Sequence, residues 1–170
     1  MLDLNMVMQL ALQRAQTQAQ AQGVELQPAL VPYPLLIQAE EESLHQMTMH
    51  LISNALQFTP SGGRVVLRTE LDAMEYLARL CVEDNGPGIP PEVLPRLFDR
   101  LYQVGTGREG SGLGLELVRR VAETFGGSIK VTSPPGTGAR FCVSFPCTGP
   151  RWRAPNAPNG APGNRSGRFS

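Results

Sequence analysis

Residues 77–90 constrain the fold more than any other stretch, because a strand pattern runs directly into an open turn. Its first half alternates two sets of side chains, as a half-buried strand does: Leu80 and Val82 against Arg79 and Cys81. Regular pairing is expected to stop at the sequence Asp84-Asn-Gly-Pro-Gly88, which favours a turn. Asp84 is then oriented by the strand behind it and suited to accept a hydrogen bond from a planar donor such as an exocyclic amine. Gly88 lets a ligand approach the backbone.

Two further features belong to the same candidate site. Turn sequences such as Asp84-Asn-Gly86 are common, so on their own they are a weak signal. A second glycine cluster, Gly110-Ser-Gly-Leu-Gly-Leu115, leads directly into a helical pattern, and a helix that carries Asn54 precedes both. Because the three features occur together, we interpret them as parts of one binding site.

Composition excludes several classes of protein. The chain has 170 residues, enough for one domain with a substantial core. Its 15 basic and 15 acidic residues cancel, which argues against a nucleic-acid surface built on bulk charge but not against a small anionic ligand. No apolar run approaches the roughly 20 residues of a membrane span, and no signal peptide is recognised at the N-terminus. We expect a cytoplasmic protein or the cytoplasmic part of a larger sensor protein.

The number and positions of the cysteines predict neither a metal site nor a disulfide. Cys81, Cys142 and Cys147 are odd in number, and the first two fall in predicted strands. We therefore expect reduced, buried thiols. The two histidines lack a matching cysteine spacing, so no zinc site is expected.

Hydrophobic periodicity predicts alternating helices and strands. Helices are expected at residues 2–22, with Asp3 as N-cap and Gly23 as stop, at 40–58, from 91 to 97 and at 113–125. Strands are expected at residues 24–30, confined to an edge by prolines, and at 64–71, 76–83, 129–132 and 141–145. This order favours a two-layer α/β sandwich over residues 1–147. Residues 148–170, rich in Pro, Gly, Asn and Arg, are expected to be disordered.

The helix at residues 40–58 carries the first candidate ligand. Acidic residues in its first turn suit the helix dipole. One face is apolar, formed by Leu44, Met47, Leu51, Ala55 and Phe58. His50 and Asn54, four residues apart, share a neighbouring face, and we expect Asn54 to project inward.

Four short sequences, in this order, resemble the ATP-binding catalytic domain of sensor histidine kinases. We name them the asparagine box (residues 50–60), the first glycine box (84–89), the phenylalanine box (97–102) and the second glycine box (110–115). The resemblance covers about residues 1–146. It implies membership of the superfamily that includes type II topoisomerases, a mismatch-repair ATPase and an ATP-driven chaperone. It also implies the Bergerat ATP-binding fold, a mixed and mostly antiparallel sheet with helices on one face.

The resemblance implies ATP and Mg²⁺ as ligands. Asp84 is expected to bind the adenine amine, with Gly88 assisting through its backbone, and Asn54 to ligate Mg²⁺ through its side-chain oxygen. Backbone amides at the start of the helix that follows the second glycine box are expected to face the phosphates. The remaining positions carried over as nucleotide-binding are Gly86, Ile89, Phe98, Gly110, Gly112, Leu113, Gly114 and Leu115.

Residues 103–111 would form the ATP lid, a polar, glycine-rich loop that is mobile by composition. Phe98 would pack under it, and Arg100 is expected to reach toward the phosphates or the partner domain. A Rossmann turn is excluded for the second glycine box, because no hydrophobic strand leads into Gly110. A Walker loop is excluded because no Lys-Ser or Lys-Thr pair follows the glycines.

Three residues depart from the family pattern. His50 stands where the asparagine box usually begins with asparagine, Gln57 replaces a lysine, and Ala139 replaces a threonine that helps to hold the adenine network. Two roles remain open for His50: it orients or deprotonates a group at the γ-phosphate, or it is a helix-face histidine hydrogen-bonded locally.

The resemblance implies a kinase that transfers the γ-phosphoryl group of ATP to a histidine on a separate or upstream dimerisation domain, within a two-component pathway that ends in a response regulator. Neither His45, followed by Gln46, nor His50, followed by Leu51, has the acidic neighbour of a phospho-accepting histidine. Two alternatives stay open: a serine kinase of the anti-sigma type, and a nucleotide-binding pseudokinase or regulatory module. A gyrase-like ATPase is disfavoured, since no transducer domain follows Pro146.

Overall fold

The structure is a computed structural model that describes residues 1–98 and 113–147. Its helices are α1 (Leu4–Gln22), α2 (Glu41–Phe58) and α3 (Leu113–Thr124). Its longer strands are β2 (Glu25–Ala29), β4 (Arg64–Asp72), β5 (Leu77–Asp84), β6 (Ser128–Thr132) and β7 (Ala139–Pro146). Two short strands, β1 (Leu2–Asp3) and β3 (Leu36–Ile37), pair with each other.

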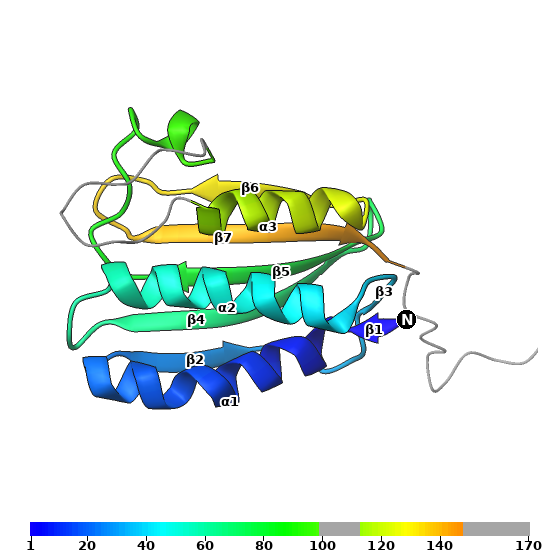
Figure 1. The fold of residues 1–170 in the computed structure, drawn as a ribbon, viewed down its shortest axis with the longest axis horizontal. Coiled ribbons are helices and arrows are strands. Elements are labelled where there is room, and N and C mark those ends of the chain that lie inside the picture. The colour runs from blue at the N-terminus through cyan, green and yellow to red at the C-terminus, as the bar shows by residue number, and fades with distance from the viewer. Residues whose placement is uncertain (99–112, 148–170) are drawn as a thin grey trace, which may run out of the picture.

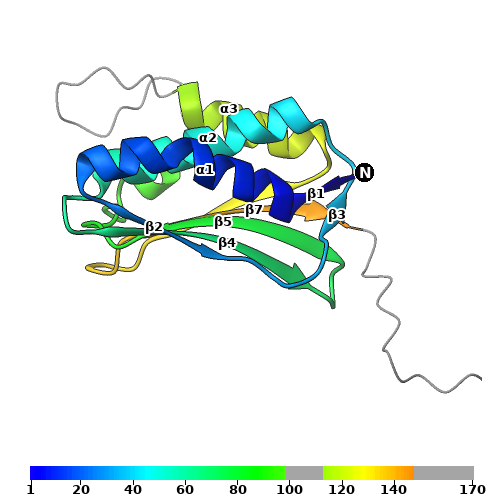
Figure 2. The same ribbon diagram turned by 90° about the horizontal axis from the view of Figure 1, so that it is seen from below.

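The expected two-layer α/β sandwich is confirmed. The long strands form one sheet in the order β2-β4-β5-β7-β6 (Figure 1). β2 pairs with β4 in parallel, whereas the other pairs are antiparallel. All three helices cover the same face of this sheet (Figure 2), and the apolar core fills the space between the two layers. None of the helices in the described ranges combines the length and the hydropathy of a membrane span.

The predicted ends of α1 are confirmed. The carboxylate of Asp3 accepts the N–H of Asn5 at 3.0 Å, which satisfies one of the free donors of the first turn. Gly23 has the left-handed conformation (φ 69°), and its N–H returns to the carbonyls of Ala19 and Gln20. The chain then enters β2, which forms one edge of the sheet, as its Pro28 requires.

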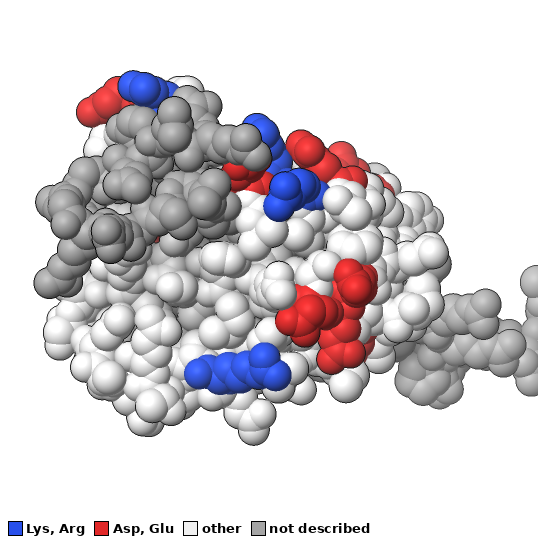
Figure 3. All heavy atoms as spheres, viewed as in Figure 1, with Lys and Arg blue, Asp and Glu red and all other residues white. Residues whose placement is uncertain are grey.

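Helix α2 has the predicted apolar face with one exception. Acidic side chains gather over its beginning (Figure 3), where Glu41 and Glu42 occupy the first turn. Along the face Leu44, Met47, Leu51 and Ala55 are buried. Phe58 was expected there but is 46% exposed, because Thr59, four residues after Ala55, continues the buried face instead. The Thr59 hydroxyl donates to the carbonyl of Ala55 at 2.6 Å.

The prediction of three reduced thiols is wrong. Cys81 and Cys142 form a disulfide between β5 and β7, while Cys147 is free. The two residues lie directly opposite each other in the antiparallel register. Cys81 alternates along β5 with the core residues Leu80 and Val82, so the disulfide lies on the other face of the sheet, which no helix covers (Figure 2). On that face the guanidinium of Arg140 donates to Cys142 Sγ at 3.1 Å and pairs with Glu70 at 2.6 Å.

The helix expected from residue 91 to 97 is much shorter. Only Leu94–Arg96 is helical, as one turn of 3₁₀-helix. Four prolines lie between residues 87 and 95, and each removes a backbone donor, so an α-helix cannot propagate there. Val93 and Leu97 are nevertheless buried and anchor the turn to the core.

Candidate functional site

One end of the molecule brings together three elements that carry predicted site residues and one turn that carries none. The C-terminal end of α2, the end of β5, the beginning of α3 and the turn between β6 and β7 all lie at this end (Figure 1). Asn54 lies in the last turns of α2, Asp84 is the last residue of β5, and Leu113 begins α3. The fold therefore gathers residues that lie up to 59 positions apart in the sequence.

Asp84 is held by the backbone on both sides. Its Oδ1 accepts the N–H of Gly86 at 2.9 Å, and its carboxylate also accepts the N–H of Ala139 on the neighbouring strand. Burial raises the pKa of the Asp84 carboxyl group, while these two hydrogen bonds oppose the rise. A half-buried carboxylate with a fixed orientation can accept further hydrogen bonds from a ligand.

Gly88 and Ile89, in the first glycine box, lie against the turn between β6 and β7. Gly88 has φ +81°, which disfavours any other residue, and a Cβ there would lie 2.9 Å from Ser133 Oγ. The N–H of Ile89 donates to the same Ser133 Oγ at 2.7 Å. Ser133 was missed at the sequence level, because Ser-Pro-Pro-Gly is typical of an ordinary turn.

Asn85 joins the first glycine box to strand β4, and Gly86 lies against the end of the helix that carries Asn54. Asn85 Oδ1 accepts the N–H of Arg64 at 2.7 Å, and the N–H of Asn85 donates to the Arg64 carbonyl at 3.2 Å. A Cβ on Gly86 would lie 2.9 Å from the carbonyl oxygen of Phe58, the last residue of α2. This role of Asn85 was not predicted, because its place after Asp84 in a turn was the only signal in the sequence.

Asn54 is half-buried on α2, and within the described ranges its side chain makes no hydrogen bond. Its amide oxygen is an appropriate ligand for Mg²⁺, which is usually held by one or two protein oxygens together with phosphates and water. The described residues contain no cluster of three or more His, Cys, Asp or Glu that would enclose a metal. This donor set fits a Mg²⁺ ion carried mainly by a nucleotide.

The two histidines of α2 differ in environment. His50, one turn before Asn54, is exposed, and its side chain makes no hydrogen bond within the described part of the chain. His45 is buried, and its Nε2 lies 2.7 Å from Nη1 of Arg14 on α1. Burial, and then the charge of Arg14, lowers the pKa of His45. A histidine enclosed in this way is a poor phosphoryl acceptor.

The second glycine box is described in part. Leu113 and Gly114 are the first residues of α3, as expected for amides that face an anion. Leu115 and Phe98 are half-buried and pack against the core. The other predicted residues of this region, Arg100, Gly110 and Gly112, lie outside the described residues, as do the predicted lid at 103–111 and the predicted disordered tail at 148–170.

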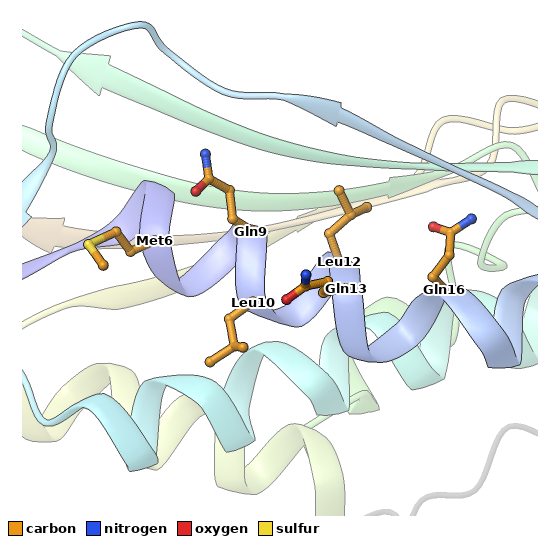
Figure 4. Close-up of a pocket in the computed structure, with 6 residues that line it drawn as sticks. All are labelled: Met6, Gln9, Leu10, Leu12, Gln13 and Gln16. Carbon is orange, nitrogen blue, oxygen red and sulfur yellow. The ribbon is translucent and has the colours of Figure 1, made fainter.

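A groove along α1 offers no comparable chemistry. The side chains that line it, all from α1, project from the flank of the helix (Figure 4) and include no titratable group: Met6, Gln9, Leu10, Leu12, Gln13 and Gln16. The end of the molecule that carries Asp84 therefore remains the candidate site.

Comparison with known proteins identifies the family to which the chain is similar. Residues 39–149 match the family described as "Histidine kinase-, DNA gyrase B-, and HSP90-like ATPase". Over 148 residues the chain is 36% identical to the histidine protein kinase DivJ of Caulobacter vibrioides, which covers 85% of this chain and 24% of that protein. It is 37% identical over 132 residues to the sensor histidine kinase CusS of Escherichia coli K12. This match covers 75% of the present chain and 26% of CusS. The chain thus spans about a quarter of the length of these two relatives.

Solved structures show the same fold. The mycobacterial sensor histidine kinase MprB superposes with a TM-score of 0.77 at 26% identity, covering 86% of this chain and 97% of that one. Full-length ShkA in complex with AMPPNP superposes with a TM-score of 0.76 at 29% identity, covering 86% of this chain and 30% of that one.

Proposed function

Because the chain belongs to the family of histidine kinase-, DNA gyrase B- and HSP90-like ATPases, we propose that residues 1–147 form the catalytic domain of a sensor histidine kinase. This domain binds ATP with Mg²⁺ and transfers the γ-phosphoryl group to a histidine on a dimerisation domain. A response regulator then accepts the phosphoryl group. The reaction takes place in the cytoplasm, where ATP is available.

The observation that carries the proposal is the environment of Asp84. Two backbone amides fix its half-buried carboxylate at the open end of the sheet, with Gly88 beside it. An exocyclic amine of adenine is a planar donor that matches this acceptor. A charge-assisted hydrogen bond in a partly dehydrated site contributes about 1.5–3 kcal/mol, enough to select the base.

The other predicted site residues bind the triphosphate and its Mg²⁺ ion or act at the γ-phosphate. Asn54 supplies one oxygen to Mg²⁺, which neutralises charge on the phosphates when it is bound. The amides of Gly112, Leu113 and Gly114 donate to the phosphates at the start of α3. Arg100 and His50 act near the γ-phosphate, Arg100 by its positive charge and His50 by orienting the acceptor. Catalysis then depends mainly on positioning and charge stabilisation.

A phosphotransfer assay tests this proposal. The chain is incubated with Mg²⁺ and γ-labelled ATP, with a histidine-bearing dimerisation domain taken from a relative such as DivJ as the acceptor. We expect label on the acceptor that is lost in acid, because phosphohistidine is acid-labile. Asp84→Asn should abolish most of the transfer.

Other results would support the competing functions. An acid-stable product would indicate a serine kinase instead. Binding of ATP without transfer to any histidine-bearing domain would indicate a regulatory module, which the residues His50, Gln57 and Ala139 would then help to explain.

A further inference from the structure

We propose that Ser133 is a positioning residue of the adenine pocket, because its hydroxyl group joins the first glycine box to the turn between β6 and β7. This inference rests on the proposed function, since it assigns Ser133 to the site that Asp84 forms for the base. Ser133 itself is not expected to touch the nucleotide.

The hydroxyl of Ser133 uses both of its hydrogen-bonding functions inside the protein. Its oxygen accepts the N–H of Ile89 at 2.7 Å, and its hydrogen is donated to the carbonyl of Gly138 at 2.7 Å. The residue is only 6% exposed, so water does not readily replace either partner. In a buried chain of this kind each hydrogen bond polarises the next.

The two partners belong to backbone segments that lie against each other, and one of these segments packs on Asp84. On one side, Ile89 follows Gly88, whose close approach to Ser133 leaves no room for a side chain. On the other side, Gly138 has φ +79° and packs so closely on the Asp84 carbonyl that a Cβ would collide with it. Ala139, the next residue, pairs with Asp84 in the sheet and donates its N–H to the carboxylate. Ser133 therefore ties the segment that follows Asp84 in the first glycine box to the turn that packs on Asp84.

The identity of residue 139 makes this role more important. Alanine has no hydroxyl group, so residue 139 acts on Asp84 only through its backbone N–H. The position of that N–H depends on how the turn at residues 134–138 is held. Among the described residues, Ser133 is the one whose side chain bonds both this turn and the first glycine box.

The test begins with hydrogen exchange in the nucleotide-free protein. Ser133→Ala removes the acceptor for Ile89, so we expect its amide to exchange faster. The control is Thr137→Ala, which removes a hydroxyl from the same turn. Thr137 is exposed, and among the described residues its hydroxyl bonds only the carbonyl of Pro134, so the exchange of Ile89 should stay unchanged in this control.

The second measurement compares two nucleotides by competition with a fluorescent analogue: ADP, and purine riboside diphosphate, which lacks the exocyclic amine. Ser133→Ala should weaken ADP binding about fivefold to thirtyfold, which corresponds to the loss of one or two ordinary hydrogen bonds. The affinity for purine riboside diphosphate should fall by a smaller factor, so the ratio of the two affinities, which measures the preference for ADP, should decrease. Thr137→Ala should alter neither affinity. If Ser133→Ala does not fold, Ser133→Cys keeps a similar shape with a weaker donor, and the same preference is measured on it.

Two outcomes overturn the inference alone: unchanged ADP affinity in Ser133→Ala, or equal losses for both nucleotides, which would mean a structural role only. Failure of the unaltered protein to bind either nucleotide overturns the proposed function and this inference together.

Discussion

The proposed function depends on Asp84, and the charged carboxylate of this residue lowers the stability of the nucleotide-free protein. Burial raises its pKa above the ordinary value, which means that the folded protein disfavours the charged form. The sign follows from linkage: the folded state binds the proton more tightly, so stability from this group is present at low pH and is lost as pH rises through the pKa of folded Asp84. A carboxylate at a half-buried position, where its charge lowers stability, is consistent with a role in binding a ligand.

We predict that Asp84→Asn does not destabilise the nucleotide-free protein at neutral pH and raises its melting temperature, because a half-buried charge is removed. The difference from the unaltered protein should vanish as pH falls through the pKa of Asp84. The same variant should bind ADP at least on the order of tenfold more weakly, since a charge-assisted hydrogen bond is lost. Thermal unfolding as a function of pH and nucleotide titration measure the two effects.

Asp72 provides the matched control for this prediction. Backbone hydrogen bonds, the one from Glu75 first, lower the pKa of Asp72. Its contribution to stability is therefore present at neutral pH and lost as pH falls, so Asp72→Asn should change the melting temperature in the opposite direction. A lower melting temperature for Asp84→Asn at neutral pH would contradict our account of its burial.

Residues that act through the backbone were the ones that sequence reasoning missed. Asp84 and Gly88 were recognised because a carboxylate and glycines at the end of a strand carry their own chemical meaning. Ser133 and Asn85 were not, because their partners are backbone groups of residues 89 and 64, and only the folded structure brings these together.

At the scale of elements, hydrophobic periodicity predicted well which helices and strands exist. It predicted poorly which strands, and which cysteines, pair with each other. The apolar spacing of α1, α2 and α3 and the alternation in β4 and β5 predicted those elements to within a few residues. The short β1–β3 pair was missed because two-residue strands carry no period. The disulfide was missed for a related reason: Cys81 and Cys142 are 61 residues apart, and only the register of β5 against β7 places them opposite each other.

The disulfide gives a prediction at this scale. Closing a loop of this length restricts the unfolded chain, so reduction should lower the free energy of unfolding by about 2–4 kcal/mol. Denaturant unfolding with and without a reductant measures the difference. Cys142→Ala should remove the sensitivity to reductant, whereas Cys147→Ala, which changes the free cysteine, should retain it. Three titratable thiols in denatured protein prepared without reductant would contradict the pairing.

At the scale of the whole molecule, one end of the sandwich carries the chemistry. Helix α2, strand β5, helix α3 and the β6–β7 turn all present backbone or side-chain groups there (Figure 1). Asn85 links the end of β5 to β4 by hydrogen bonds, and Ser133 links the segment after β5 to the β6–β7 turn, so a nucleotide bound at this end should stabilise the domain as a unit. The chain spans about a quarter of the length of its relatives DivJ and CusS.

The central claim is that this end of the molecule binds ATP through Asp84, and thermal unfolding with nucleotide tests it most directly. The protein and its Asp84→Asn variant are unfolded with and without ADP or ATP in the presence of Mg²⁺. Nucleotide at a hundredfold excess over its dissociation constant should stabilise the unaltered protein by about 2.7 kcal/mol, and the variant much less. An unchanged melting temperature of the unaltered protein at millimolar nucleotide, or an equal shift in both proteins, would contradict the claim.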